Sequence, residues 1–411
     1  MWGVRSCRSL NSAVLLLIVP FGLASGIAKS MKVVVATDSF KGSLRADEAC
    51  QIIENAITAT LSDVVVVVKP MADGGEGTAR AMILAGHGRW IPRRVMGPLP
   101  QMQVKAGFAW FEDDTALVEM ASASGLELLS PEQMDPLKTT TFGTGELIKA
   151  AVEHGAKKIL LAVGGSATVD GGLGAAEALG WRFLDSRGAE VPLGGGGLTE
   201  LAKIVPPNHD WVLGGKKLAH VGVQVLCDVD NPLCGEHGAA RVYGPQKGAT
   251  PSMVEVLDAG LRNLARVVRE QLGREIENLP GAGAAGGLAA GAVAFMDASI
   301  VSGIETVMAR SNLREELESA DWVITGEGSF DSQSLRGKVV SGVLKLARQS
   351  KARVAVLAGQ VRLPESQWRE NGIAAAIAAK PDDMPLSEAL KNSRALLYAA
   401  AQKFARQYLS R

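Results

Sequence analysis

An acid, a hydroxyl group and a lysine lie close together in the segment 37–43: Asp38, Ser39 and Lys41. A lysine beside glycine and hydroxyl groups can bind a phosphate group, so this segment is a candidate ligand site. The same residues also fit a capped helix start, with Ser43 or Asp47 as the N-cap. The local sequence alone does not separate these two interpretations.

Two carboxylates, Asp73 and Glu76, lie three residues apart in the segment 70–78. Gly74 and Gly75 stand between them and allow the backbone to turn both side chains toward one centre. Carboxylate oxygens in that arrangement can bind a metal ion or a reacting hydroxyl group. The alternative is a helix N-terminus that Glu76 stabilises. That alternative needs only one of the three glycines in the segment, so we favour a ligand site.

Glycines and hydroxyl residues dominate the segment 164–174, which contains several candidates for anion binding or proton transfer: Gly165, Ser166, Thr168 and Asp170. The segment lies between a predicted strand and a predicted helix, and the N–H groups of a helix N-terminus can bind an anion. It is not a Walker phosphate loop, because the pattern GxxxxGK[ST] is absent from the chain. A similar segment, 139–146, is explained equally well by threonine capping of a helix.

Acidic residues recur after two further predicted strands. Asp228 and Asp230 follow the valine-rich segment 221–226, and their oxygens suit Mg²⁺, which takes one or two protein carboxylates beside waters and phosphates. An Asx turn is the alternative there. Gly326 and Glu327 follow another short strand. Because acids and glycines recur at several strand ends, we expect these loops to form one ligand site.

The elements that must position these loops form an α/β pattern. Short apolar runs alternate with helical segments from Met31 onward, which predicts layers of helices around a largely parallel sheet. The predicted strands are 33–36, 64–68, 158–163, 221–226, 322–325 and 353–358. The predicted helices include 46–60 and the Gly/Ala-rich stretch 280–294, and the four glycines 194–197 predict a mobile loop.

Two domains are expected in a chain of 411 residues. The pattern changes near residue 95, where prolines become frequent, and returns near residues 290–300. We therefore predict one domain built from both chain ends, residues 31–95 and 295–411, and a second domain inserted over residues 96–294.

The first thirty residues outline a secretory signal, since Arg5 and Arg8 precede the apolar run 14–19 and small residues follow it. The run is too short to span a bilayer comfortably. The alternative is that translation begins at Met31 and that residues 1–30 are an upstream, non-catalytic segment. We favour this alternative, and we expect a cytoplasmic protein, because the later motifs point to nucleotide chemistry.

Composition excludes several classes of protein. The 43 basic and 43 acidic residues give a formal net charge of zero, so there is no electrostatic footprint for nucleic acid. With 47% hydrophobic and 21% charged residues, the chain is folded rather than disordered. The four cysteines have no CxxC spacing and the five histidines are scattered, which argues against a zinc ribbon, a redox dithiol or a histidine-built metal site.

With these segments in order, the chain resembles the bacterial type I glycerate kinase family from Met31 almost to the C-terminus. The resemblance rests on collinear segments at 38–43, 71–78, 123–126, 140–147, 164–174, 228–232, 243–249, 280–287 and 325–328. Two positions depart from the family pattern. Thr37 stands where the family often has proline, and Val169 stands where it often has asparagine, which removes one polar side chain from the segment 164–174.

The resemblance implies ATP-dependent phosphorylation of D-glycerate, usually at the 2-hydroxyl, in an active site between two α/β domains. It also implies that the domain built from both chain ends is flavodoxin-like and that the inserted domain is a separate α/β unit. The partners are then ATP and D-glycerate, with neither a nucleic acid nor a membrane, and a homo-oligomer is left open. Phosphoryl transfer needs mainly positioning and charge neutralisation, which a lysine, Mg²⁺ and backbone amides can supply.

Within this family, we expect Lys41 to bind phosphate or the substrate carboxylate, and Asp73 with Glu76 to bind the reacting hydroxyl or the metal. Asp170 is a second candidate base, and Asp228 with Asp230 are the alternative metal ligands. The remaining candidates bind substrate or nucleotide: Asp38, Ser39, Gly74, Gly75, Gly165, Ser166, Thr168, Gly326 and Glu327.

Three rival functions follow from the same residues. A kinase that forms 3-phosphoglycerate differs only in the hydroxyl that reacts. A hydroxy-acid oxidoreductase needs a nucleotide fingerprint directly after a strand, and the only GxGxxG match, 281–286, follows Asn278-Leu279-Pro280 instead. A non-catalytic binding module does not explain why acids and glycines recur at strand ends.

Overall fold

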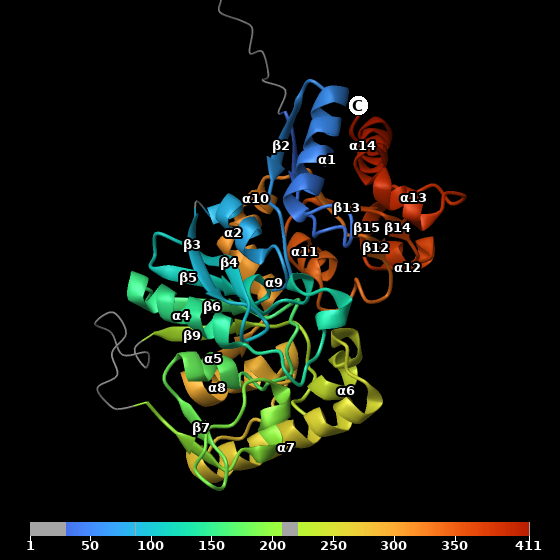
Figure 1. Ribbon diagram of the computed structural model, residues 1–411. Coiled ribbons are helices and arrows are strands. Elements are labelled where there is room, and N and C mark those ends of the chain that lie inside the picture. The colour runs from blue at the N-terminus through green and yellow to red at the C-terminus, as the bar shows by residue number, and fades with distance from the viewer. Residues whose placement is uncertain (1–29, 87, 208–220, 411) are drawn as a thin grey trace, which may run out of the picture. The chain divides into compact units, whose positions relative to one another are not determined.

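Residues 30–86, 88–207 and 221–410 are described in the computed structural model, and their strands form two larger sheets (Figure 1). The first sheet is entirely parallel, with the strand order β15-β13-β11-β1-β2. Its strands are β1 (Met31–Val35), β2 (Val64–Val68), β11 (Trp322–Thr325), β13 (Arg353–Ala358) and β15 (Ile373–Ala378). Both ends of the described chain therefore contribute to one sheet.

The second sheet has the strand order β10-β9-β6-β5-β4-β3 and is mixed. Its strands are β3 (Arg89–Met96), β4 (Gln103–Trp110), β5 (Thr115–Glu119), β6 (Lys158–Ala162), β9 (Gly222–Leu226) and β10 (Ser299–Val301). The hairpin of β3 and β4 is antiparallel, as is the pairing of β4 with β5, and the remaining pairs are parallel. Two short pairs, β7 (Arg182–Leu184) with β8 (Lys203–Val205) and β12 (Ser329–Phe330) with β14 (Gln360–Val361), lie outside these sheets.

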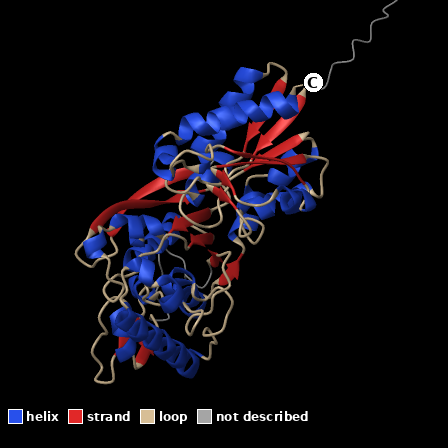
Figure 2. Ribbon diagram, turned by 90° about the vertical axis from the view of Figure 1, so that its right-hand side faces the viewer, coloured by secondary structure: helices blue, strands red, loops and turns tan. Residues whose placement is uncertain are grey.

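Helices cover both faces of the sheets (Figure 2). Helices α1 (Ala46–Thr60) and α14 (Ser393–Phe404) pack on one face of the five-stranded sheet. Helix α1 forms because Ile53, Ile57 and their neighbours fall on one side at helical spacing and are buried. Trp322 of β11 meets Phe404 of α14 edge to face, with ring centroids 5.2 Å apart.

A shared helical layer covers the opposite face of that sheet. Helices α2 (Thr78–Gly86), α9 (Gly303–Arg310), α10 (Leu313–Glu318) and α11 (Val339–Ala347) contribute to it. The same apolar cluster includes Val34 and Val323 of the five-stranded sheet and Leu117 and Leu160 of the six-stranded sheet. The two sheets are therefore joined through one core, and residues 31–411 form one compact unit.

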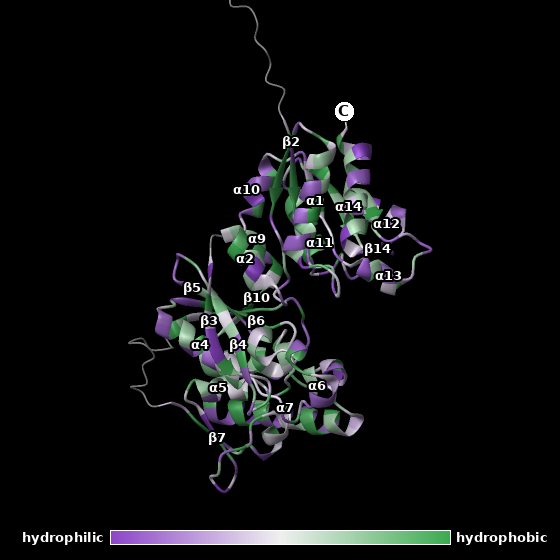
Figure 3. Ribbon diagram, turned by 45° about the horizontal axis from the view of Figure 1, so that its top comes forward, coloured by the Kyte–Doolittle hydropathy of each residue, from purple (hydrophilic) through white to green (hydrophobic). Residues whose placement is uncertain are grey.

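A third cluster covers the other face of the six-stranded sheet, with helices α4 (Phe142–His154), α5 (Leu173–Ala178), α7 (Pro251–Leu272) and α8 (Leu288–Met296). The shorter helices complete the fold: α3 (Ala121–Ser124), α6 (Ala239–Tyr243), α12 (Glu365–Glu370) and α13 (Leu386–Lys391). Figure 3 shows the apolar strands enclosed by helices with polar outer faces. Parallel strands covered on both faces read as uninterrupted apolar runs, which is the pattern seen in β11 and β13. β2 is also a run of valines, but it is the edge strand of its sheet and Val65 is exposed.

Two local predictions are wrong. The stretch 280–294 is not a continuous helix, because α8 begins only at Leu288 and the turn before it places Ala285 and Gly286 at positive φ. A Cβ on Gly286 would lie 1.9 Å from the carbonyl oxygen of Thr168, so a close backbone approach interrupts the helix there. The glycines 194–197 do not form a loose loop either, since residues Gly195–Glu200 form a 3₁₀ helix in which Gly195 and Gly197 are buried.

The strands mark where the chain passes from one sheet to the other. It enters the six-stranded sheet at Arg89 and leaves it after Val301, whereas the domain boundaries predicted from the sequence are near 95 and 295. Those domain limits stay a prediction. The signal-like segment 1–30 lies outside the described residues except for Ser30. In the described part of the chain, every helix is too short or too polar to cross a membrane.

Candidate functional site

A cavity of about 1170 Å³ opens where loops from both sheets meet. The loops after β1, β2, β6 and β9 all reach it, together with residues 243–247 and 333–338. Most of the residues predicted as site residues line this cavity: Asp38, Ser39, Lys41, Asp73, Gly74, Gly75, Glu76, Gly165, Ser166 and Asp228. The expected gathering of strand-end loops is therefore present.

Two glycine loops can meet only because neither carries side chains at the crossing. A Cβ on Gly164 would lie 2.4 Å from Cα of Gly75, and one on Gly74 would lie 2.9 Å from the carbonyl oxygen of Leu226. The N–H of Gly164 also donates to the carbonyl oxygen of Gly74 over 3.3 Å. These glycines hold the loop after β2 against the loops of the six-stranded sheet.

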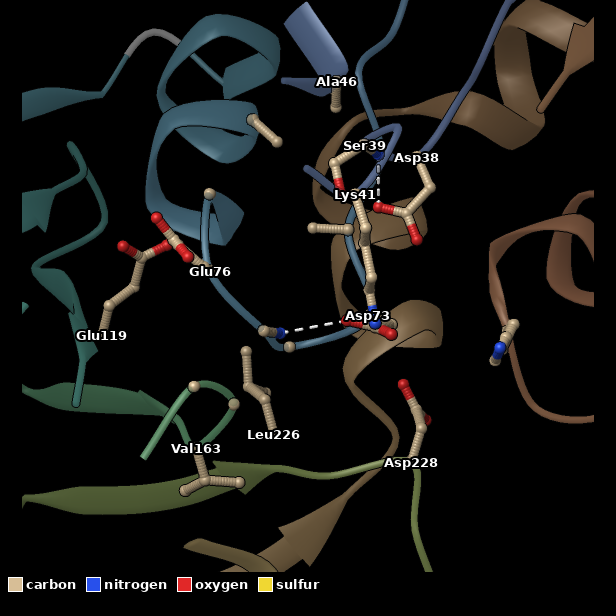
Figure 4. Close-up of a pocket in the computed structure, with 18 of the residues that line it drawn as sticks. Asp38, Ser39, Lys41, Ala46, Asp73, Glu76, Glu119, Val163, Leu226 and Asp228 are labelled. Carbon is tan, nitrogen blue, oxygen red and sulfur yellow. Dashed lines mark hydrogen bonds between the residues drawn. The ribbon is translucent and has the colours of Figure 1, made fainter. Parts of the chain in front are cut away.

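Acidic groups from three loops meet around Lys41, whose side chain extends toward Asp73 in Figure 4. Burial raises the pKa of Asp38 to about 7, with the charges of Asp73 and Glu327 adding to the shift and Lys41 opposing it. The N–H of Ser39 donates to Oδ1 of Asp38 over 2.6 Å. This corner of the cavity therefore holds more negative charge than Lys41 alone can balance.

A second acidic group surrounds the N-terminus of α2. Oε1 of Glu119 accepts a hydrogen bond of 2.7 Å from the N–H of Ala79, and burial raises the pKa of Glu119 to about 7, with the charge of Glu76 adding to the shift. Burial also raises the pKa of Glu76, and the neighbouring Glu127 raises it further. Figure 4 shows the side chains of Glu76 and Glu119 close together. Glu119 was not predicted from the sequence, because its immediate neighbours Val118 and Met120 are apolar.

Asp228 caps a helix at the cavity wall. Its Oδ1 accepts from the Ser302 hydroxyl over 2.6 Å and from the N–H of Gly303 over 3.1 Å, and its Oδ2 accepts from the N–H of Ile304 over 2.9 Å. Burial raises its pKa. Both oxygens thus hold the start of α9, and Asp230 is exposed and absent from the cavity lining. The structure does not bring this predicted pair to one centre.

Asp170 and Thr168 lie behind the cavity wall rather than in its lining. Asp170 is fully buried, and its Oδ2 accepts from the N–H and the hydroxyl of Thr141, both over 2.8 Å, while its Oδ1 accepts from the N–H of Gly172 over 3.1 Å. This geometry gives Asp170 the role of joining the starts of α4 and α5. A catalytic base must reach its substrate, so the arrangement does not favour Asp170 in that role.

Lys247 is a buried lysine in the lining of the same cavity and was not among the predicted site residues. Its Nζ donates to the Ser166 hydroxyl over 2.7 Å and to the carbonyl oxygen of Thr168 over 2.8 Å, and the residue is only 2% exposed. Burial lowers its pKa to about 7, and the charge of Asp170 opposes that shift. Lysine beside glycine in the segment 243–249 was the available signal, but the link to Ser166 spans 81 residues.

Glu327 lines a neighbouring cavity of about 340 Å³ that shares Asp38, Lys41 and Asp73 with the larger one. Burial raises the pKa of Glu327. Gly326 lines neither cavity, and it is needed because a Cβ there would lie 1.9 Å from the carbonyl oxygen of Leu357.

The carboxylates of the cavity could hold a metal ion only if waters and phosphate oxygens supplied its other ligands. Among the described residues, no group of three or more His, Cys, Asp or Glu side chains is arranged to hold an ion. Mg²⁺ needs only one or two carboxylates when it keeps waters and phosphate oxygens as its other ligands. The excess negative charge around Asp38 fits such an ion, and Asp38 is the residue that would hold it together with phosphate oxygens.

Comparison with known proteins finds matches to one family over nearly the whole chain. The model of the "Glycerate kinase family" matches residues 33–409. A glycerate kinase of Halalkalibacterium halodurans is 43% identical over 91% of this chain and 97% of its own. The glycerate 2-kinase of Escherichia coli is also 43% identical, over 88% of this chain and 94% of its own.

A solved structure agrees with these relatives. The crystal structure of "putative glycerate kinase 2" from Salmonella typhimurium LT2 is 41% identical, covers 92% of this chain and 98% of its own, and superposes with a TM-score of 0.78. Matches of this length and identity include every loop of the cavity described above. The chain therefore belongs to the glycerate kinase family of enzymes.

Proposed function

We propose that this chain transfers the γ-phosphoryl group of ATP to the 2-hydroxyl of D-glycerate, forming 2-phosphoglycerate and ADP with Mg²⁺. The observation that carries the proposal is the meeting of Lys41, Arg336 and Lys338 with Asp38 and Asp73 in one cavity of a chain of this family. Three cations beside two carboxylates match the needs of phosphoryl transfer, which are charge neutralisation and positioning. We also expect a cytoplasmic location, and this remains a prediction.

Asp73 is our candidate for the group that accepts the proton of the reacting hydroxyl. The hydroxyl oxygen forms a bond to the γ-phosphorus, the bond from that phosphorus to the bridging oxygen of ADP breaks, and the proton passes to the Asp73 carboxylate. The N–H of Gly75 donates to Oδ1 of Asp73 over 3.2 Å, which helps to orient the carboxylate. Lys41 and Lys338 neutralise charge on the phosphate oxygens.

Lys247 is our candidate for binding the carboxylate of D-glycerate. Lys247 and its hydrogen-bond partner Ser166 both line the larger cavity. A substrate carboxylate would supply the counter-charge that the Ser166 hydroxyl and the Thr168 carbonyl cannot. Asp38 would hold Mg²⁺ together with ATP, and the ion would neutralise phosphate charge.

The reaction is tested by incubating purified protein with D-glycerate, ATP and Mg²⁺ and coupling the product to enolase, with and without phosphoglycerate mutase. A signal without mutase establishes 2-phosphoglycerate as the product. A signal that requires mutase establishes the 3-phosphate, and no signal in either assay refutes the proposal.

The role of Asp73 is tested with Asp73→Asn, for which we expect kcat to fall by about 10²-fold or more. Asp63→Asn is the matched control, because Asp63 is exposed and outside the cavity. Near-normal turnover of folded Asp73→Asn would show that another group accepts the proton.

A further inference from the structure

The smaller cavity, of about 340 Å³, lies at the point where the five-stranded sheet reverses its strand order. From β1 the chain continues to β2 on one side, whereas from β11 it continues to β13 and β15 on the other. The loops after β1 and β11 therefore diverge, and both line this cavity. Ligands of open α/β sheets bind outside the carboxyl ends of the strands at such a point.

One wall of the cavity is apolar and comes from α13 and α14. Leu386 and Leu390 lie four residues apart on α13, and Leu396 and Leu397 belong to α14. Leu386 is 56% exposed and Leu390 is 39% exposed, although both are large and apolar. Leucines left open to a cavity can receive the flat apolar face of a ligand, and burying them there is favourable.

Two other residues of the lining carry buried polar atoms without partners. Oε1 of Glu327 and Oγ of Ser329 are both buried, and neither has a hydrogen-bond partner among the described residues. Both residues line the cavity. Buried polar atoms are almost always paired, so these two point to a ligand that donates hydrogen bonds to them.

The two cavities share charged residues of both signs. Lys41 and Lys338 line both cavities, and so do Asp38 and Asp73. The lining of the smaller cavity therefore combines apolar side chains, hydrogen-bonding groups and cations that can bind phosphate beside carboxylates. A nucleoside triphosphate carries groups that match these, with a base, a sugar whose hydroxyls can form hydrogen bonds, and a polyanion.

We propose that this cavity binds the nucleoside of the phosphoryl donor, with the base against the leucines of α13 and α14 and the ribose hydroxyls donating to Glu327 and Ser329. The proposal rests on the function proposed above, because it assigns a place to the donor of that reaction. The larger cavity is then left to the acceptor. Glycerate has no apolar face to bury, and its carboxylate would be repelled by Glu327.

Ser393→Trp tests the assignment by filling the cavity, since Ser393 lies at the start of α14 and lines it. Ala395→Trp is the matched control, because Ala395 is exposed on the same helix and outside the cavity lining. Titration calorimetry with ADP measures binding without turnover, and steady-state kinetics give the KM for ATP and for D-glycerate separately. We expect Ser393→Trp to raise the Kd for ADP and the KM for ATP at least tenfold, with the KM for glycerate within twofold and Ala395→Trp unchanged.

Leu390→Asp is a second variant with the same expected effects, because it replaces part of the apolar wall without filling space. If both folded variants bind ADP as the wild type does while the wild type phosphorylates glycerate, the nucleoside assignment is wrong and the proposed function stands. If the wild type binds ADP, the variants lose it, and glycerate is not phosphorylated, the assignment holds and the proposed acceptor is wrong. A wild type that binds no ADP overturns the assignment.

Discussion

Lys247→Met tests whether the buried lysine is held largely without its proton. Burial lowers the pKa of Lys247 from 10.5 to about 7, whereas in the unfolded chain a lysine has its ordinary value of about 10.4. At pH values between these two pKa values, Lys247 carries a proton in the unfolded chain that it lacks in the folded chain. The free energy of unfolding therefore rises with pH across this window, which is the reverse of the usual effect of a paired lysine.

The magnitude follows from the two pKa values. Each pH unit over which the states differ by one proton changes the free energy of unfolding by about 1.36 kcal/mol. Between pH 7.5 and 9.5 the difference is slightly less than one proton, so Lys247 contributes a rise of about 2–3 kcal/mol. Lys247→Met removes this contribution. The buried thiols of Cys50 and Cys234, whose pKa values burial also raises, are present in both proteins and cancel in the comparison.

Urea unfolding of both proteins at several pH values between 7.5 and 9.5 measures this difference. We expect the free energy of unfolding of the wild type, minus that of Lys247→Met, to rise by about 2–3 kcal/mol over the range. Lys351→Met is the control, because Lys351 is exposed and should give parallel curves. If the Lys247→Met and wild-type curves are also parallel, the folded protein keeps the proton on Lys247 and our account of its environment is wrong.

Two further substitutions separate structural from catalytic roles. Gly164→Ala should lower the free energy of unfolding by about 1–3 kcal/mol, because its Cβ would lie 2.4 Å from Cα of Gly75, whereas Gly222→Ala, with open space at its Cβ, should have little effect in the same urea experiment. Asp228→Asn should lower stability by about 0.5–2 kcal/mol through the weakened cap of α9 while leaving the Mg²⁺ dependence of turnover unchanged. If turnover of Asp228→Asn needs a tenfold higher Mg²⁺ concentration than turnover of the wild type, Asp228 is a metal ligand.

The strands were predictable where the sequence alone determines them. The predicted strands 64–68, 322–325 and 353–358 coincide with β2, β11 and β13. In β11 and β13 the apolar run is needed because the strand is covered on both faces, whereas the edge strand β2 was identified by the strand preference of its valines. The helix 46–60 likewise coincides with α1, since its apolar side is set by local spacing. The stretch 280–294 failed because a distant carbonyl, that of Thr168, approaches Gly286 too closely for a continued helix.

The candidate site was predictable only where the local sequence carries the signal. Loops that carry acids beside glycines, such as the segment 70–78, could be identified because both residue types have local consequences. Glu119 and Lys247 were missed because their chemistry depends on burial and on partners far along the chain, such as Ala79 and Ser166. Asp170 was chosen for its sequence neighbourhood, yet its hydrogen bonds from Thr141, the residue before α4, hold it behind the cavity wall. Local sequence therefore indicates where a ligand loop lies, and long-range packing decides which of its acids reach the ligand.

The raised pKa of Asp38 gives a test of charge balance in the cavity. Burial and the charges of Asp73 and Glu327 raise this pKa to about 7, so about half of the Asp38 carboxyls carry a proton at pH 7 before a ligand binds. A divalent cation bound with nucleotide beside Asp38 favours the carboxylate, so binding of Mg·ADP at pH 7 should release up to about half a proton. Calorimetric titration in two buffers with different enthalpies of ionisation measures this release, and Asp38→Asn should abolish its share. If Mg·ADP binds the wild type with no proton release at pH 7, Asp38 is already a carboxylate in the free protein. The negative charge that we assign to this corner must then be balanced by Lys41 and Lys338 without a metal ion.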